Sequence, residues 1–160
     1  MRIRNVLDPR RVLLDVTGSS KHEILANLVA TLALTHRDID REALLETLME
    51  RERTSTTAIA DGIAIPHGRH AIGDHVVSVF ARSIPGLDFD SIDGEPTHIF
   101  FMLVSPENQP TLHLRWLAHL AVLLRDEDFR RALLDASSVD EVMAVIEAAE
   151  QAHAVAKGVA

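Results

Sequence analysis

Residues 99–104 read Ile-Phe-Phe-Met-Leu-Val, an uninterrupted apolar run of the right length for a β-strand. A strand that faces solvent on one side alternates apolar and polar residues, whereas an unbroken apolar run is typical of a strand buried on both faces. Burial on both faces requires covering layers above and below the sheet. The run therefore predicts a central strand of an α/β domain, with helices on either side.

Three further stretches have weaker strand character. Residues 76–82 alternate imperfectly between two apolar faces, and residues 11–16 and 59–65 are shorter candidates. Together with the central run they predict a single α/β domain with a mixed sheet of about five strands, flanked by helices on both faces. The domain is expected to span residues 1–150. Residues 151–160 are rich in alanine and are expected to form a frayed C-terminal tail.

Capping residues mark where the helices begin. Ser20 and Ser138 each precede a glutamate by three residues, which is the spacing of a capping box. Asp38 or Asp40 is expected to cap another helix, with Thr54 in the turn that follows it. Two more helices are predicted over residues 111–125 and 126–135, so helical segments separate most of the strands.

The composition excludes several classes of protein. The chain of 160 residues is long enough to bury one core, and its net charge of −8 argues against binding to nucleic acid, which requires clustered cations. The sequence has no cysteine, which excludes disulfides, thiolate catalysis and cysteine-based zinc sites. No apolar window approaches the ~18 residues of a membrane span, and the N-terminus has no signal-peptide core. We therefore expect a cytoplasmic protein without a membrane span.

Residues 51–68 read R-E-R-T-S-T-T-A-I-A-D-G-I-A-I-P-H-G and contain the main candidate for chemistry, His67. Pro66 fixes its own φ and favours extended geometry at Ile65, so a strand is expected to end here and to present the imidazole. Gly68 is expected to leave room for a large group beside the ring. The alternative is a turn histidine that only bonds to backbone.

His113 is the second candidate, in the first turns of the helix predicted over residues 111–125. It shares one helical face with Trp116, Leu117 and Leu120, so it is expected to point inward. The N-terminal end of a helix favours an anion. The alternative is a core histidine that completes the helix end. His119 lies off this face and is expected to be exposed or packed at an edge.

Arg51 is the third candidate, at the end of the helix that precedes the Thr-Ser-Thr-Thr turn. A guanidinium can bind a phosphate through two N–H groups. The alternative is an exposed ion pair with Glu50 or Glu52, which would contribute little. Arg53 competes with Arg51 for the same role.

A metal site is a further alternative, because the spacing of His67, His70 and His75 could supply three imidazoles. No carboxylate or cysteine falls at a helix-fixed ligand spacing such as H-E-x-x-H. Pro66 and Gly68 also prevent the helical geometry that would bring two of these rings together. We therefore predict no metal site.

The stretch 51–68 resembles the active-site signature of the mannitol/fructose class of enzyme IIA domains. These domains belong to the bacterial phosphoenolpyruvate-dependent phosphotransferase system, and the family also includes the nitrogen-regulatory enzyme IIA. Comparable family segments match F-D-S-I-D-G-E-P at residues 89–96, the apolar run 99–104, and H-L-R-W-L-A-H-L-A at residues 113–121. The resemblance extends over about residues 3–150.

The resemblance implies a role for each candidate. His67 matches the histidine that is phosphorylated, His113 the histidine that donates a hydrogen bond to the phosphoryl group, and Arg51 the arginine that supports the phosphate. Thr56 takes the place of a family serine and keeps the hydroxyl, and Thr56 and Thr57 are expected to support phosphate binding.

Two positions depart from the family pattern. Ala58 and Ala60 stand where the family often has glycines. An alanine leaves less room for close backbone approach and makes the loop stiffer.

The function implied is that of a phosphohistidine carrier, a phosphotransferase component that needs neither a metal nor another cofactor. It would accept a phosphoryl group from the histidine-containing phosphocarrier protein and pass it to an enzyme IIB, or hold it as a regulatory signal. The chain has no segment that resembles enzyme IIB or IIC, which favours a nitrogen-regulatory role over sugar transport. Two alternatives remain: a regulatory protein-binding module of the same fold without obligatory transfer, and, more distantly, a metal-dependent hydrolase.

Overall fold

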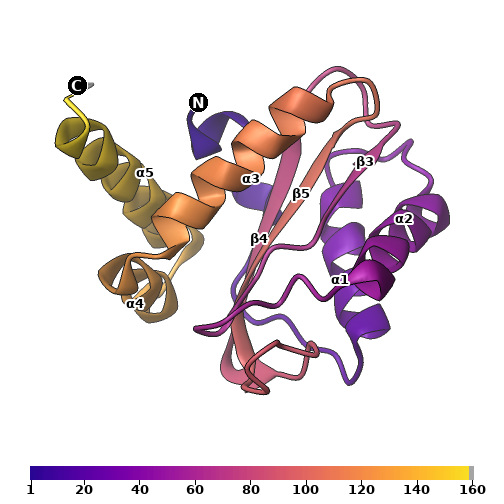
Figure 1. Ribbon diagram of the computed structural model, residues 1–160, viewed down its shortest axis with the longest axis horizontal. Coiled ribbons are helices and arrows are strands. Elements are labelled where there is room, and N and C mark those ends of the chain that lie inside the picture. The colour runs from indigo at the N-terminus through magenta and orange to yellow at the C-terminus, as the bar shows by residue number, and fades with distance from the viewer. Residues whose placement is uncertain (159–160) are drawn as a thin grey trace.

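A single mixed sheet forms the centre of the computed structural model, which describes residues 1–158 (Figure 1). Its strands are β1 (Val12–Leu13), β2 (Ile63–Ala64), β3 (His67–His70), β4 (Val77–Leu87) and β5 (Thr97–Pro106). The strand order is β1-β4-β5-β2, and β3 pairs with β5 next to β2. β4 runs antiparallel to β5, while the remaining pairs are parallel. The predicted mixed five-stranded α/β domain is therefore confirmed.

Two layers of helices cover the sheet. The helices are α1 (Lys21–Ala33), α2 (Arg41–Thr54), α3 (Pro110–Leu124), α4 (Glu127–Asp135) and α5 (Val139–Ala156), with short 3-10 helices at Ile3–Asn5 and Pro9–Arg11. In Figure 1, α1 and α2 lie on one side of the sheet, and α3, α4 and α5 lie on the other. This arrangement leaves both faces of the central strand covered.

β5 supplies apolar side chains to both layers, as its unbroken apolar run predicted. Ile99, Phe101 and Leu103 pack into the core beneath α3 and α5, while Phe100 and Met102 pack into the core beneath α1 and α2. All five are at most 1% exposed. Burial at this level stabilises the fold by about 1.5–3 kcal/mol for each large side chain.

The predicted capping residues begin the helices as expected. The Ser20 hydroxyl accepts from the backbone N–H of Glu23, and the Ser138 hydroxyl accepts from that of Glu141. Asp40, not Asp38, caps α2, through the N–H of Ala43. These bonds satisfy donors that the first turn of a helix leaves unpaired.

Several boundaries differ from the sequence-based prediction. The first strand is only two residues long, because Pro9 begins a 3-10 helix that includes Arg11. The second strand begins at Ile63, after a turn in which Asp61 and Gly62 have φ angles of 64° and 72°. β4 extends beyond residue 82 to Leu87, with an irregular register.

Two helix ends also differ from the prediction. Thr54 is the last residue of α2 rather than part of the turn. α5 continues to Ala156, six residues into the segment expected as a frayed tail, of which residues 159–160 lie outside the described part. No helix within residues 1–158 combines the length and apolar character needed to cross a membrane.

Candidate active site

His67 opens strand β3 instead of ending a strand. β2 ends at Ala64, the chain passes through Ile65 and Pro66, and it re-enters the sheet at His67, opposite Leu103 of β5. Pro66 has no N–H for the ladder, but its carbonyl accepts from the N–H of Leu103 at 2.9 Å. The prediction of a strand end is therefore corrected to a short interruption that places His67 at the start of β3.

Two hydrogen bonds fix the tautomer of His67. Nδ1 lies 2.7 Å from the carbonyl oxygen of Ile65, and Nε2 lies 3.2 Å from Nε of Arg51. A carbonyl only accepts and a guanidinium only donates, so Nδ1 carries the proton and Nε2 presents a lone pair. Burial lowers the pKa of His67 below its ordinary value; the bond to Ile65 opposes this effect, and the charge of Arg51 adds to it. His67 is thus a neutral imidazole whose Nε2 has a free lone pair.

Arg51 reaches His67 from the last turn of α2. Its Nη1 donates to the carbonyl oxygen of Ser55 at 2.8 Å, which holds the guanidinium across the end of the helix. Glu52 turns away to pair with Lys21. Arg53 pairs with Glu46 on the surface at 2.8 Å. The structure therefore brings Arg51, and not Arg53, to the imidazole.

His113 faces His67 from the first turns of α3. The two ring centroids lie 5.4 Å apart, with an angle of 49° between the planes. The His113 side chain is buried, and its Nδ1 lies 2.7 Å from the hydroxyl oxygen of Ser105 on β5. Burial, together with the neighbouring His67 and Arg69, lowers the pKa of His113 to about 4. His113 is therefore neutral at physiological pH.

The three candidates line one pocket of about 330 Å³, together with Thr47, Gly68 and Arg69. The two guanidinium groups supply positive charge, and Nε2 of His67 presents a lone pair. A pocket with this content suits a phosphoryl group, because cations and N–H donors stabilise the charge on its oxygens. A larger pocket of about 390 Å³ lies elsewhere on the surface and contains none of these three side chains.

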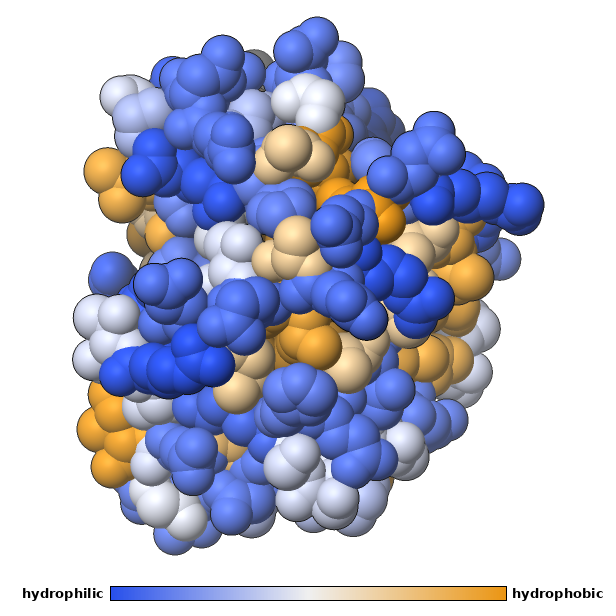
Figure 2. Space-filling view, turned by 90° about the vertical axis from the view of Figure 1, so that its right-hand side faces the viewer, coloured by the Kyte–Doolittle hydropathy of each residue, from blue (hydrophilic) through white to orange (hydrophobic). Residues whose placement is uncertain are grey.

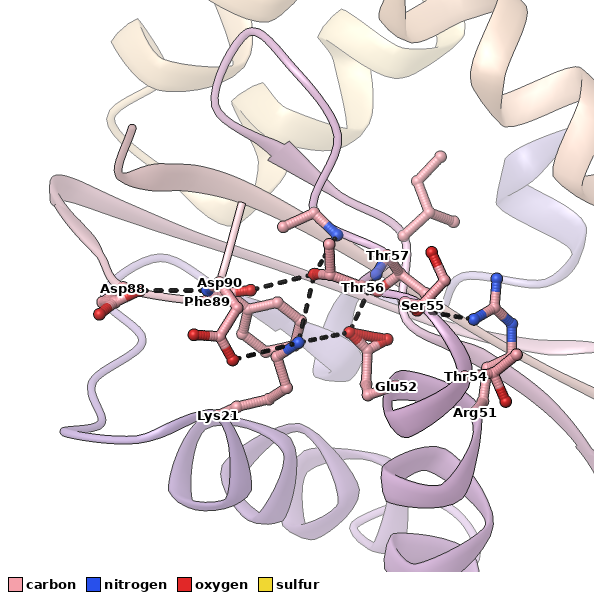
Figure 3. A network of polar contacts seen from close by, with 12 residues as sticks. Lys21, Arg51, Glu52, Thr54, Ser55, Thr56, Thr57, Asp88, Phe89 and Asp90 are labelled. Carbon is pink, nitrogen blue, oxygen red and sulfur yellow. Dashed lines mark hydrogen bonds and ion pairs between the residues drawn. The ribbon is translucent and has the colours of Figure 1, made fainter. Parts of the chain in front are cut away.

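Thr56 and Thr57 lie in a neighbouring network (Figure 3). The Thr56 hydroxyl donates to the carbonyl of Phe89 and accepts from Nζ of Lys21, each at 3.2 Å. Thr57 is buried, and its N–H donates to Oε1 of Glu52 at 3.0 Å. Neither threonine lines the pocket of His67, so their predicted support of the phosphate stays a prediction.

The centre of that network is an ion pair that the sequence analysis missed. Nζ of Lys21 lies 3.1 Å from Oε1 of Glu52, 3.5 Å from Oδ2 of Asp90, and 4.8 Å from the centre of the Phe89 ring (Figure 3). The side chains of Lys21 and Glu52 are only 12% and 2% exposed. The pair fixes the segment after α2, whose Ser55 carbonyl holds Arg51. No local pattern signals it, because Lys21 and Asp90 come from distant parts of the chain.

Gly68 allows helix α2 to pack closely against strand β3. A Cβ atom at this position would lie 3.1 Å from Cγ2 of Thr47 and 3.7 Å from Cδ2 of Leu48. The space expected beside His67 for a large group is thus partly occupied by α2, which carries Arg51. Ala58 is fully buried and forms an antiparallel bridge with Ala64.

The remaining histidines lie apart from this pocket. Within residues 1–158, no three histidine, aspartate or glutamate side chains lie close enough to hold a metal ion together. The spacing of His67, His70 and His75 therefore does not produce a cluster of imidazoles. Nδ1 of His70 instead lies 3.3 Å from the hydroxyl of Thr47. His119 is partly buried, with Nε2 2.6 Å from Oε2 of Glu150, which also accepts from the N-terminal segment.

Comparisons with known proteins identify relatives over nearly the whole chain. The family model described as "Phosphoenolpyruvate-dependent sugar phosphotransferase system, EIIA 2" matches residues 5–149. A nitrogen regulatory protein of Bradyrhizobium diazoefficiens is 36% identical over 148 residues, which cover 91% of this chain and 96% of that protein. The fructose-specific EIIABC component of Bacillus subtilis is 34% identical over 146 residues, which cover 91% of this chain but only 23% of that protein.

The solved structures agree with this result. The crystal structure of the nitrogen regulatory protein IIA-Ntr from Neisseria meningitidis matches with a TM-score of 0.83 and 31% identity, over 90% of this chain and 98% of that one. IIA mannitol of Escherichia coli, solved in complex with phosphorylated IIB, shares the fold with a TM-score of 0.72 at 19% identity, over 89% and 99% of the two chains. The resemblance inferred from residues 51–68 is confirmed: the chain belongs to the EIIA 2 family of the phosphoenolpyruvate-dependent sugar phosphotransferase system.

Proposed function

We propose that this protein is a phosphohistidine carrier in which Nε2 of His67 accepts the phosphoryl group. The observation that carries the proposal is the tautomer of His67, which presents a lone pair on Nε2 and holds its proton on Nδ1. An N–P bond forms at Nε2 while the N–P bond of a phosphohistidine donor breaks, and its electron pair returns to the donor nitrogen. Nδ1–H keeps its hydrogen bond to Ile65 and so stabilises the positive charge that develops on the ring.

The neighbouring groups assist by position and charge. Arg51 donates to the nucleophilic nitrogen at rest and would turn its N–H groups toward the phosphoryl oxygens as the bond forms. His113, across the pocket, would donate a hydrogen bond to one of these oxygens. Thr56 and Thr57 would support the phosphate indirectly, through the segment that positions Ser55 and hence Arg51. Such preorganised donors stabilise the charge of the transition state, and the transfer needs no metal or other cofactor.

The chemistry also indicates the partners. The donor would be the histidine-containing phosphocarrier protein, because a phosphoryl group passes readily between two imidazole nitrogens of similar leaving ability: the N–P bond that breaks resembles the one that forms. The acceptor would be an enzyme IIB or a regulatory target, and the protein would act in the cytoplasm with these partners. A nitrogen-regulatory role is favoured, because the IIA-Ntr protein of Neisseria meningitidis resembles the chain more, with a TM-score of 0.83 and 31% identity, than IIA mannitol of Escherichia coli, with a TM-score of 0.72 and 19% identity. The face that includes α2 is mainly hydrophilic with small apolar patches, a character that suits transient docking (Figure 2).

Phosphorylation in a reconstituted system tests this proposal. The protein is incubated with phosphoenolpyruvate, enzyme I and the phosphocarrier protein, and intact mass is measured. We expect a gain of one phosphate that is labile in acid and stable in base. His67→Ala should abolish the gain, whereas His70→Ala, in the same strand but outside the pocket, should retain it. Labelling of His67→Ala at the wild-type level would refute the assignment, and an unlabelled wild type that still binds the carrier would indicate a binding module.

A further inference from the structure

We propose that Ser105 is a positioning residue that sets the tautomer of His113, so that His113 presents Nε2–H to the phosphoryl group on His67. The placement of the proton follows from the structure alone. Its use in transfer rests on the proposed function. Sequence analysis did not single out Ser105, which lies in β5 where the apolar run has ended.

The contact between the two side chains is short and buried. Oγ of Ser105 lies 2.7 Å from Nδ1 of His113, and the exposed fractions of the two residues are 0% and 8%. In β5, Ser105 lies opposite Arg69 of β3, two residues from His67. Ser105 therefore lies beside the strand whose residues His67, Gly68 and Arg69 line the pocket, and water does not reach its hydroxyl.

The surroundings of the hydroxyl decide which group donates. A hydroxyl has one proton and two lone pairs. Within residues 1–158, the hydroxyl of Ser105 makes a single hydrogen bond, the one to Nδ1 of His113. If Nδ1 of His113 carried a proton, the Ser105 hydroxyl would accept, and its own hydrogen would be buried without an acceptor. Because an unpaired buried donor is costly, the arrangement in which Ser105 donates to a bare Nδ1 is favoured.

The ring must then carry its proton on Nε2. His113 remains neutral because burial lowers its pKa to about 4, so one of its two nitrogens is protonated and the other is not. With Nδ1 as the acceptor from Ser105, Nε2 is the donor. The bond to Ser105 also fixes the orientation of the ring relative to His67, 5.4 Å away.

The two facing histidines thus hold opposite tautomers. A backbone carbonyl, which only accepts, draws the proton of His67 to Nδ1 and frees the lone pair of Nε2. The Ser105 hydroxyl donates to Nδ1 of His113, so Nδ1 is unprotonated and Nε2 carries the proton. The pocket therefore contains one nucleophile and one neutral donor. With a lone pair on its own Nε2, His113 would repel the phosphoryl oxygens and compete with His67 for phosphorus.

Nitrogen NMR tests the tautomers without any transfer reaction. Two-bond ¹H–¹⁵N correlation spectra of wild-type protein labelled at histidine distinguish a protonated from a bare ring nitrogen. We expect His113 with Nε2–H and bare Nδ1, and His67 with the reverse pattern. Ser105→Ala should convert the His113 signals to an average of two tautomers and leave those of His67 unchanged. A proton on Nδ1 of wild-type His113 would overturn the proposal, whether or not the protein is phosphorylated in the transfer assay.

Single-turnover transfer tests the consequence for function. His113→Ala should slow transfer by ~10²-fold, as expected for one positioned donor, and Ser105→Ala by about three- to tenfold, since the donor remains but is no longer held in one state. Ser78→Ala is the matched control, because Ser78 is a buried serine of the same sheet whose hydroxyl donates to the carbonyl of Met102 at 3.0 Å.

A double variant separates positioning from general damage. In the His113→Ala background, Ser105→Ala should have no further effect on the transfer rate, because it acts through the missing ring. An equal loss in both backgrounds, or wild-type transfer by Ser105→Ala, would overturn the role in transfer. Absence of phosphorylation in the wild type would instead refute the proposed function.

Discussion

Arg51 donates through Nε to Nε2 of His67, the nitrogen that has the lone pair, over 3.2 Å. In the proposed transfer, the guanidinium therefore already lies at the nitrogen that the phosphoryl group approaches. Its positive charge disfavours protonation of the ring, while its N–H groups can move from the lone pair to the phosphoryl oxygens. Under the proposed function, one side chain would thus keep His67 unprotonated before transfer and stabilise the charge during transfer.

Removing this charge should raise the pKa of His67. In the wild type the pKa is lowered first by burial and further by Arg51, so Arg51→Gln removes one of the two causes. We expect the pKa of His67 in Arg51→Gln to move up toward the ordinary value, as measured by an NMR pH titration. Arg53→Gln is the control, because Arg53 pairs with Glu46 on the surface. An unchanged or lower pKa in Arg51→Gln would show that the guanidinium does not face the ring in solution.

His113 should make the stability of the protein depend on pH. The folded state holds its pKa at about 4, whereas the unfolded chain has the ordinary value near 6.5. Between these values the unfolded state binds the proton and the folded state does not, so the free energy of unfolding falls as pH decreases from 6.5 toward 4. His113→Gln should lose less stability than the wild type between pH 7 and pH 5, as measured by urea denaturation. Parallel pH dependence of the two proteins would contradict the shift.

The elements that can be predicted from the sequence are those with a local cause. The unbroken apolar run of β5 determines burial on both sides, and the capping serines at positions 20 and 138 bond to residues three positions away. Arg51 and His67 could be singled out because the motif that contains them is contiguous, and His113 because its helical face is regular; the structure brings the three to one pocket. The family, too, was evident from these segments.

The elements that escaped prediction depend on partners far along the chain. β3 forms only because residues 67–70 pair with β5, and nothing in its four polar and small residues indicates a strand. The proline before it indicates an interruption but not its length. The pair of Lys21 and Glu52 joins residues 31 positions apart on different helices. A local pattern carries no information on such contacts, which arise from packing.

The pair of Lys21 and Glu52 should contribute measurably to stability. Glu52→Ala would leave Lys21 with only the exposed Asp90 as an ionic partner and the Thr57 N–H without its acceptor. We expect a loss of about 2–3 kcal/mol in the free energy of unfolding, somewhat below the range for fully buried pairs because Lys21 is not fully enclosed. Glu46→Ala, which breaks the exposed pair with Arg53, should cost less than about 1 kcal/mol. Equal losses in the two variants, measured by urea denaturation, would be inconsistent with a structural role for the buried pair.

The close approach of α2 to β3 at Gly68 should be detectable by a compensating substitution. In Gly68→Ala the new Cβ would lie 3.1 Å from Cγ2 of Thr47, a contact that pushes α2, and with it Arg51, away from His67. We expect a net loss of about 1–2 kcal/mol in stability from this overpacking, together with slower phosphoryl transfer. Thr47→Ser removes Cγ2 but keeps the hydroxyl that donates to the carbonyl of Ala43.

The double variant Gly68→Ala/Thr47→Ser should therefore recover most of the stability and of the transfer rate that Gly68→Ala alone loses. Because the two positions are in contact, their effects should not add, and the coupling energy from the double-mutant cycle should be at least ~0.5 kcal/mol. Strictly additive losses would show that the two side chains do not meet and that Gly68 does not set the distance between α2 and β3. Recovery of stability without recovery of transfer would show that the position of α2 does not control the contact between Arg51 and His67.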